Sequence, residues 1–244
     1  MRKRTLQELI NTTDPAWPLV QQWIVEAQNT VEVLPVERER ARIVLLHLQV
    51  TTRSPMGAMA LETGGILIDH GWLRFLGSGN ERICGDLLSW NSSEDLPGHR
   101  SLKDALIVAY DVVGGFFSLN GGAFPGKPGT IFYFAPDSLQ WESTNKSYSD
   151  LLHWALCGDV GLFYKHMRWP DWENDIAALR GNQGISIYPF VFLNKNIPIT
   201  SRSRRAVSVY ELWDLYHDLA QQLRNLPAGT PIQFIINKDS NSVE

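Results

Sequence analysis

Apolar residues recur every three or four positions through the first fifty residues, which predicts helices. The stretch TLQE at 5–8 fits a capping box. A second helix should begin with Asp14 as its cap and Pro15 at its first position. We expect a third helix over Val36–Leu48 and a short fourth helix that starts near Pro55.

Short apolar runs replace this helical spacing in the middle of the chain. The stretch GGILIDHGWLRFLG predicts two strands around an Asp-His-Gly turn at 69–71. Four more runs follow, separated by glycine, proline and asparagine: ALIVAYD, FFSLN, GTIFYFA and SLQWEST. Short loops join antiparallel neighbours, so these strands predict an antiparallel meander. The stretch at 83–91 fits a helix and a strand equally.

The glycine pairs in DVVGGFFSLNGG at 111–122 raise the question of a phosphate loop. Such a loop needs a Lys-Ser/Thr after the glycines or a GxGxxG motif that opens a helix, and neither occurs here. A hairpin is therefore predicted. Gly114 or Gly115 should have a positive φ, and residues 116–119 should pair antiparallel with residues 106–110.

Helical spacing returns after the meander. Ser147 is the expected cap of a helix that stops at Gly158, and two helical pieces should follow with a break before Pro170. The stretch ISIYPFVF predicts a strand or an extended segment. The last helix, in SVYELWDLYHDLAQQLRNLP, should begin with a capping box of Ser208 and Glu211 and end at Pro227.

The order along the chain, with helices first, then a strand meander and then helices, predicts the α+β class. We expect a central antiparallel sheet with helices from both ends of the chain packed on it. We expect a single domain over 1–244. Its N-terminal helices should occupy 1–50, its C-terminal helical extension 161–236 and a flexible tail 237–244.

Composition narrows the classes of function. The 244 residues are 44% hydrophobic and 20% charged, as in a globular protein, and the net charge of −4 offers no basic stripe for nucleic acid. Cys84 and Cys157 are far apart and lack a CxxC partner, which argues against a zinc site rich in cysteine. The lack of a signal-type apolar segment or a run of about 20 apolar residues predicts a cytoplasmic protein without membrane contact.

Two short stretches offer candidate chemistry. Arg53 precedes a helix start, where it could hold a carboxylate or phosphate, or else Ser54 caps the helix and Arg53 pairs with a buried acid of the core. Asp69 and His70 could form a base with its orienting partner. Adjacent residues of a strand point to opposite faces, however, and a simple turn explains them equally well.

Other catalytic constellations are weak. The six histidines show no HxH or HxxxH pair, so a metal site would have to be assembled from distant segments. A GxSxG elbow is also missing, and Cys84 has no catalytic motif around it. We therefore predict no catalytic residues, no metal and no cofactor.

Basic and aromatic residues offer candidate contacts for a partner. The basic stretch SRSRR, with Arg202, Arg204 and Arg205, would suit an acidic partner or a phosphate, or form a solvated loop. Tryptophan is enriched at binding hot spots, although most tryptophans fill cores. Trp169 and Trp172 in RWPDWE are the best candidates for an exposed anchor, or else they clamp their helix to the sheet. Trp72 follows the predicted turn.

The order of these motifs resembles a known superfamily. Residues 107–119, 131–141 and 147–156 are similar to the strands and the helix start of the SUKH superfamily, over a core at 60–160. Leu48–Gly77 resembles the signature of a bacterial family catalogued only as a domain of unknown function. SUKH proteins include a yeast regulator of cell-wall glucan synthesis and bacterial immunity proteins. The resemblance implies a binding scaffold without known catalytic residues, and the long segment beyond Gly158 departs from it.

Three hypotheses follow for the function. The first is a binding protein that is not an enzyme and has a protein partner, with neutralisation of a toxin as its most specific form. The second is a ligand-binding protein or enzyme with a pocket near Arg53, Asp69 and Asp111. The third is a regulatory or structural protein linked to cell-wall processes. Neither the partner nor the oligomeric state is predicted from the sequence.

Overall fold

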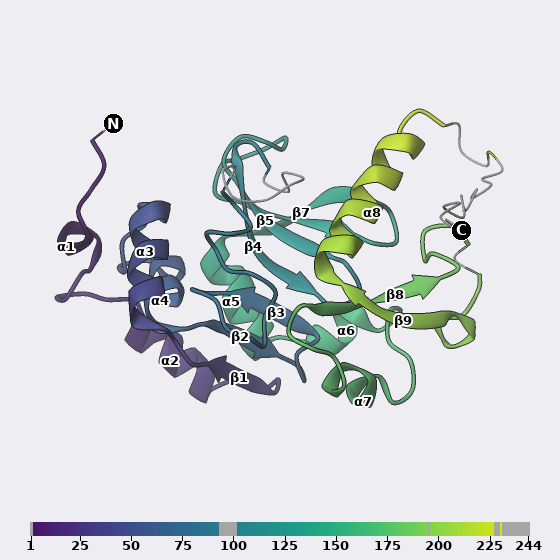
Figure 1. The fold of residues 1–244 in the computed structure, drawn as a ribbon, viewed down its shortest axis with the longest axis horizontal. Coiled ribbons are helices and arrows are strands. Elements are labelled where there is room, and N and C mark those ends of the chain that lie inside the picture. The colour runs from purple at the N-terminus through teal and green to yellow at the C-terminus, as the bar shows by residue number, and fades with distance from the viewer. Residues whose placement is uncertain (1, 93–101, 195, 227–229, 231–244) are drawn as a thin grey trace, which may run out of the picture.

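Seven strands form one antiparallel sheet in the computed structural model, which describes residues 2–92, 102–194, 196–226 and 230 (Figure 1). Each strand pairs with the next one along the chain. The strands are β1 (Val31–Leu34), β2 (Gly65–Ile68), β3 (Leu73–Leu76), β4 (Ala105–Asp111), β5 (Phe116–Asn120), β6 (Ile131–Ala135) and β7 (Gln140–Lys146). The predicted α+β class and the central antiparallel meander are confirmed.

Both predicted hairpins are present. The β2–β3 turn occupies residues 69–71, all three with positive φ. Gly114 has a φ of +93° in the β4–β5 turn, and residues 116–119 pair antiparallel with residues 106–110. Because glycine has no Cβ, it adopts this left-handed conformation without strain.

Four helices precede or interrupt the first strands: α1 (Leu6–Leu9), α2 (Trp17–Val25), α3 (Arg38–Leu48) and α4 (Pro55–Glu62). Thr5 caps α1 in the predicted capping box, and Ser54 caps α4. The expected start of α2 is wrong. The N-cap residue is Ala16, and the proline in the first turn is Pro18 instead of Pro15. The first turn of a helix tolerates a proline because its amides have no partner within the helix.

A strand also lies among the helices expected over 1–50. β1 pairs with β2 at the edge of the sheet, with Val31 opposite Ile68. Its four residues, VEVL, include an exposed glutamate, and only Leu34 is buried. The short length and exposed surface of an edge strand give little periodic signal, which explains why the sequence pattern missed it.

The second half of the chain adds α5 (Tyr148–Cys157), α6 (Val160–Tyr164), α7 (Trp172–Ala177), β8 (Gln183–Tyr188), η1 (Ile199–Ser201), β9 (Ser203–Ser208) and α8 (Val209–Leu223). Ser147 caps α5 and Gly158 follows its end, as predicted. The break before Pro170 separates α6 from α7. Ser208 caps α8 by accepting from the Tyr210 amide, instead of the Glu211 amide that a capping box requires.

The helical extension expected over 161–236 also contains two strands. The strand predicted in ISIYPFVF is present as β8, and β9 was not predicted. β8 and β9 pair antiparallel in a separate two-stranded sheet, with Gln183 opposite Ser208. The basic stretch at 201–205 is therefore largely a strand and not a loop. The predicted tail at 237–244 and the helix end at Pro227 lie outside the residues that the structure describes.

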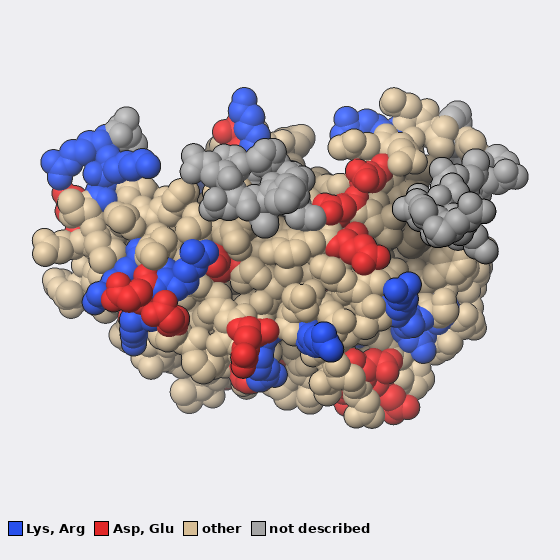
Figure 2. Space-filling model, in the orientation of Figure 1, with Lys and Arg blue, Asp and Glu red and all other residues tan. Residues whose placement is uncertain are grey.

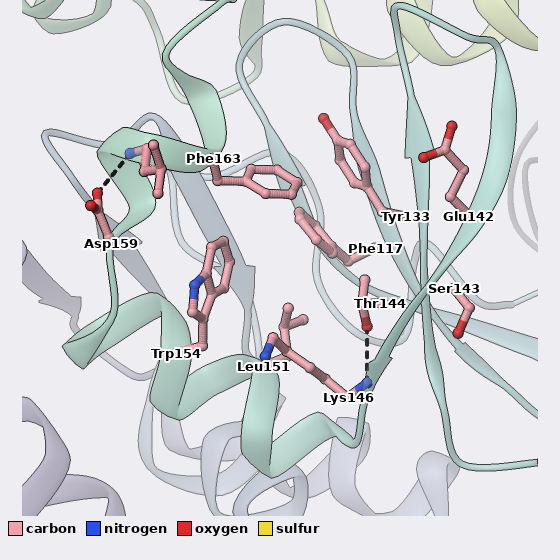
Figure 3. A pocket seen from close by; sticks show the side chains of 11 residues that line it. Phe117, Tyr133, Glu142, Ser143, Thr144, Lys146, Leu151, Trp154, Asp159 and Phe163 are labelled. Atoms are coloured by element: carbon pink, nitrogen blue, oxygen red, sulfur yellow. Dashed lines mark hydrogen bonds between the residues drawn. The ribbon is translucent and has the colours of Figure 1, made fainter.

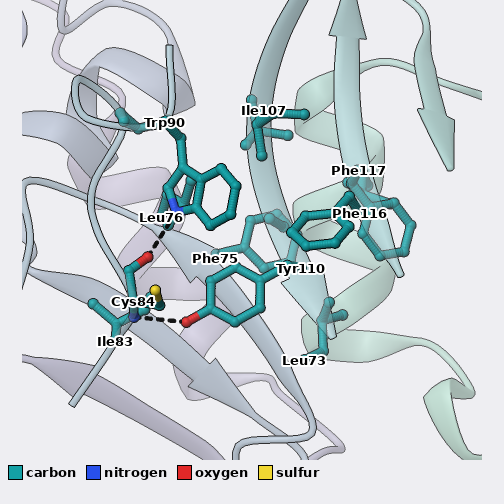
Figure 4. Close-up of a cluster of buried hydrophobic side chains, with 14 of the residues drawn as sticks. Leu73, Phe75, Leu76, Ile83, Cys84, Trp90, Ile107, Tyr110, Phe116 and Phe117 are labelled. Atoms are coloured by element: carbon teal, nitrogen blue, oxygen red, sulfur yellow. Dashed lines mark hydrogen bonds between the residues drawn. The ribbon is translucent and has the colours of Figure 1, made fainter. Parts of the chain in front are cut away.

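Aromatic side chains fill the core between the sheet and α8, and Figure 4 shows Trp90, Tyr110 and Phe116 of this cluster. The Trp90 ring lies 5.6 Å from the Trp213 ring of α8 and 5.4 Å from the Phe116 ring. Trp90 Nε1 donates to the Cys84 carbonyl, and the Cys84 amide donates to the Tyr110 hydroxyl, both at 2.7 Å. These bonds hold the 83–91 segment, which consists of turns and is neither helix nor strand.

Helices cover both faces of the sheet near β5–β7. Phe116 and Phe134 face α8, where rings of Trp213 and His217 pack on them, and Phe117 and Tyr133 face the α5–α6 side. Figure 2 shows acidic side chains along α8 and basic ones beside β9. Within the described residues, no helix is long and apolar enough to cross a membrane.

Candidate functional site

A pocket of about 410 Å³ lies between the sheet and the two helices α5 and α6 (Figure 3). Its floor is a row of side chains across three neighbouring strands, because Phe117 of β5 is opposite Tyr133 of β6, which is opposite Glu142 of β7. Residues paired across antiparallel strands share one face, so the meander itself aligns this row.

Four aromatic rings make a continuous surface in this pocket, which we call the aromatic pocket. Phe163 of α6 points toward the sheet, with its ring 5.4 Å from Tyr133 and 6.5 Å from Phe117 (Figure 3). Trp154 of α5 lies 5.3 Å from the Phe163 ring. Leu151 and Leu162 complete the apolar lining.

Charged side chains surround the opening. Glu142 and Asp159 lie on opposite sides of the pocket, and Lys146 lies near the start of α5 (Figure 3). Asp159 accepts from the Leu162 amide at 2.6 Å and so caps α6, and Glu142 accepts from the Ser138 hydroxyl at 2.7 Å. The two carboxylates outnumber the single amine, so the rim is acidic.

A buried carboxylate lies behind the pocket floor. Asp111 accepts from the Tyr133 hydroxyl at 2.7 Å and from the Tyr164 hydroxyl at 3.2 Å. It also accepts from the Val113 and Gly115 amides, at 3.0 and 2.8 Å. Burial raises the pKa of Asp111, and burial together with the Asp111 charge raises the pKa of both tyrosines. Asp111 is thus a structural anchor that solvent does not reach.

Asp69 pairs with Arg168, whose guanidinium lies 4.9 Å from the Trp72 ring and 4.2 Å from the Trp172 ring. The Trp169 ring packs 5.8 Å from Trp72. Trp72 and Trp169 are buried and Trp172 is half-buried, so Trp169 is not an exposed anchor and the alternative of a clamp fits both residues. The three tryptophans instead clamp the 168–172 segment to the β2–β3 turn.

The remaining predicted residues lie apart from this cluster. Arg53 is exposed and pairs at 3.0 Å with Asp14, which is exposed and not the buried acid that was expected. Arg202 is buried, and its partners among the described residues are main-chain carbonyls, such as that of Phe190 at 2.9 Å. Arg204 and Arg205 are exposed on β9, and the Arg204 guanidinium lies 4.8 Å from the Trp169 ring.

The proposed grouping of Arg53, Asp69 and Asp111 is not assembled by the fold. Asp69 and Asp111 are connected, because Arg168 contacts both Asp69 and the Tyr164 ring, and Tyr164 donates to Asp111. Arg53 takes no part in these contacts, since it pairs with Asp14 beside the N-terminal helices. None of the three residues lines the aromatic pocket.

A second pocket, of about 500 Å³, adjoins the first along α5 and shares Lys146 and Trp154 with it. Asp150, His153 and Cys157 line it. Burial raises the pKa of the Cys157 thiol, which disfavours the thiolate that a nucleophile needs. Among the described residues, no three His, Cys, Asp or Glu side chains are grouped to hold a metal.

The sequence pattern did not single out the aromatic pocket. Trp154 and Phe163 belong to different helices, and their distance from Tyr133 depends on how α5 and α6 pack on the sheet. The available signal was the pair Leu162 and Phe163, two adjacent large apolar residues in a five-residue helix that cannot bury both.

Residues 6–212 match the model of a protein family, "Protein of unknown function DUF2625". The chain belongs to this family. It is 41% identical to the uncharacterised protein YbfG of Escherichia coli (strain K12), over 89% of this chain and 98% of YbfG. It is 38% identical to an uncharacterised protein of Haemophilus influenzae, over 84% of this chain and 90% of that protein. No solved structure matches the chain.

The prediction of a bacterial family of unknown function is confirmed by these matches. They contain no link to the SUKH superfamily, so that resemblance stays a prediction.

Proposed function

We propose that this DUF2625 protein is a binding protein, not an enzyme, and that the aromatic pocket holds an apolar side chain of a protein partner. The observation that carries the proposal is the open aromatic surface. Phe163 and Leu162 line it while remaining 44% and 58% exposed. Aromatic side chains at a concave surface favour apolar anchors and account for much of the affinity at hot spots.

The charges at the rim specify the chemistry of the partner. Glu142 and Asp159 flank the apolar floor, and the whole chain has a net charge of −4. A partner segment with lysine or arginine on either side of its apolar anchor would complement this rim and associate faster. The partner is therefore a basic segment with one large apolar side chain.

The polar groups of the aromatic pocket favour binding over catalysis because they already serve the fold. Thr144 donates to the Ile131 carbonyl at 2.8 Å, Asp159 caps α6 and Glu142 accepts from Ser138. A general base needs a lone pair directed at the reacting group, whereas these two carboxylates accept hydrogen bonds from groups of the fold.

In its most specific form the partner is a toxin, and the chain is an immunity protein. Basic nucleases are suited to an acidic inhibitor, which supports this form together with the resemblance noted in the sequence. If a toxin encoded beside this gene neither bound the purified chain nor lost its activity toward cells, the immunity form would be wrong. The regulatory link to cell-wall processes rests on the resemblance alone.

Two labelled synthetic peptides test the pocket directly. One carries a central phenylalanine flanked by lysines, and the other carries the same phenylalanine flanked by glutamates. We expect the lysine peptide to bind more tightly in fluorescence anisotropy. Phe163→Ser should weaken its binding about tenfold, because the variant removes one aromatic wall.

The matched control is Leu46→Ser. Leu46 on α3 and Phe163 are both 44% exposed, but Leu46 does not line the aromatic pocket. If both variants weakened binding equally, or if the two peptides bound alike, the proposal would fail.

A further inference from the structure

A separate, strongly basic pocket lies beneath the β2–β3 turn. It has a volume of about 280 Å³ and is formed by this turn, the loop at 81–82 and the loop between α7 and β8. His70, Arg74, Arg82 and Arg180 line it, and Glu81 is the only carboxylate among its described lining residues. Three arginines outnumber one glutamate in this lining. Arg82 already pairs with Glu32, so Arg74 and Arg180 are the lining arginines without an ion pair among the described residues.

Arg74 lies at the base of this basic pocket and is only 4% exposed. Its Nε donates to the Gly71 carbonyl at 3.0 Å, and its Nη1 donates to the carbonyls of Gly181 and Gln183 at 2.9 and 3.2 Å. Within the described part of the chain, no carboxylate forms an ion pair with Arg74. A buried charge without a counterion is costly, so this arrangement favours an anion from outside.

Two other arginines provide a comparison. Arg168, whose side chain is 13% exposed, has Asp69 as its counterion. Arg202 also lacks a carboxylate, but its Nε, Nη1 and Nη2 all donate to carbonyls. In Arg74 only Nε and Nη1 donate to main-chain carbonyls, and the Tyr110 hydroxyl beside it is neutral because burial raises the pKa of Tyr110 to about 12. The charge of Arg74 therefore has no acidic partner among the described residues.

The walls of the basic pocket are held in place before any ligand binds. A Cβ at Gly181 would lie 2.0 Å from the Glu81 carbonyl oxygen, so the two loops approach as closely as glycine allows. Arg74 then bonds to the Gly181 carbonyl from below. Such preorganisation lowers the entropy lost on binding.

We infer that this basic pocket binds a phosphate group. A phosphate group would supply the counterion that Arg74 and Arg180 lack among the described residues, and its oxygens suit the paired donors of guanidinium groups. An adjoining pocket of about 320 Å³ shares His70, Gly71 and Arg82, and contains Glu32 and Glu173. It has room for the organic part of a small phosphate ester. Glu32 there pairs with Arg82, and the Glu173 carboxylate favours an ester that carries an amine.

Isothermal titration calorimetry of the full chain tests this inference. The probes are inorganic phosphate and phosphoethanolamine, with chloride used to hold the ionic strength constant. We expect phosphate to bind, and Arg180→Gln to weaken its binding about tenfold through the loss of a charge-assisted contact. Arg180 is exposed, so the variant should fold. Arg74→Lys, which keeps the charge but loses the guanidinium fork, should also bind more weakly.

Arg53→Gln is the control, since Arg53 is exposed and pairs with Asp14 outside the basic pocket. It should bind phosphate like the unmodified chain. Tighter binding of phosphoethanolamine than of inorganic phosphate would identify an ester as the ligand source, and the reverse would identify free phosphate. The inference is overturned if neither probe binds, or if Arg180→Gln binds phosphate as tightly as Arg53→Gln.

Discussion

Asp111 determines the local structure behind the aromatic pocket, because its carboxylate joins the β4–β5 turn to two tyrosines. One oxygen accepts from the Val113 and Gly115 amides, and the other accepts from the Tyr133 and Tyr164 hydroxyls. A buried polar network stabilises a fold only when every member has its hydrogen-bond partner. The position of Tyr133 in the pocket floor therefore depends on a residue that does not line the pocket.

Removing the Asp111 carboxyl should destabilise the fold. Asp111→Ala leaves two buried amides without an acceptor, and we expect the free energy of unfolding to fall by about 2–4 kcal/mol. Asp111→Asn keeps an acceptor for these amides and should lose much less. Urea denaturation measures both values, and equal losses would show that the hydrogen bonds to the turn are unimportant.

The pH dependence of stability should also report on Asp111. Burial raises the pKa of Asp111, so the folded chain keeps a proton that the unfolded chain, with an ordinary pKa of 3.8, has released. The contribution of Asp111 to stability is therefore full below 3.8 and is lost as the pH rises through the folded-state pKa. Asp111→Asn should lack this dependence. Denaturation at several pH values measures the free energy of unfolding of both proteins. Parallel plots of this free energy against pH would contradict the expected role of Asp111.

At the scale of elements, the β4–β5 turn connects the sheet to α8. Gly114 combines a φ of +93° with close packing, since a Cβ there would lie 2.5 Å from the Tyr216 ring. α8 can therefore pack against this turn only if residue 114 has no side chain. This contact makes the hairpin and the last helix one cooperative unit.

Gly114→Ala should lower the free energy of unfolding by about 2–4 kcal/mol, through backbone strain and the collision with Tyr216. Gly126→Ala provides the control for backbone strain alone. Gly126 also has a positive φ, of +107°, but a Cβ at this position would meet no described atom within 4 Å. We expect a loss of about 1 kcal/mol there. Equal losses in urea denaturation would contradict the packing of α8 against the turn.

Local signals account for the elements that the sequence predicted. The caps at Thr5, Ser54 and Ser147 and the turn at Gly114 depend on neighbouring residues, and all four are present. Elements without such signals were missed. β1 is short and exposed, and β9 carries arginines on its exposed positions, so the pairing of both depends on partners distant in the sequence.

The candidate site was less predictable than the fold. Asp111 was identified as a residue of interest, but its burial could not be read from a strand end. The aromatic pocket requires Phe117, Trp154 and Phe163 to meet from a strand and two helices. Such a meeting is a property of packing, which residue spacing does not encode.

At the scale of the whole molecule, two pockets of opposite character use different parts of one fold. The aromatic pocket lies at β5–β7 beneath α5 and α6, and the basic pocket lies at the β2–β3 turn beside α7. Their lining residues do not overlap. Variants of Phe163 and Arg180 should therefore affect peptide and phosphate binding separately.

The central claim, that the aromatic pocket receives an apolar anchor of a basic partner segment, is tested most directly by side-chain NMR. The labelled full chain would be titrated with the lysine-flanked phenylalanine peptide while the aromatic signals are followed. The largest shifts should occur at Phe117, Tyr133, Trp154 and Phe163. If the shifts instead mapped to other aromatic residues, or if none occurred, the claim would be contradicted.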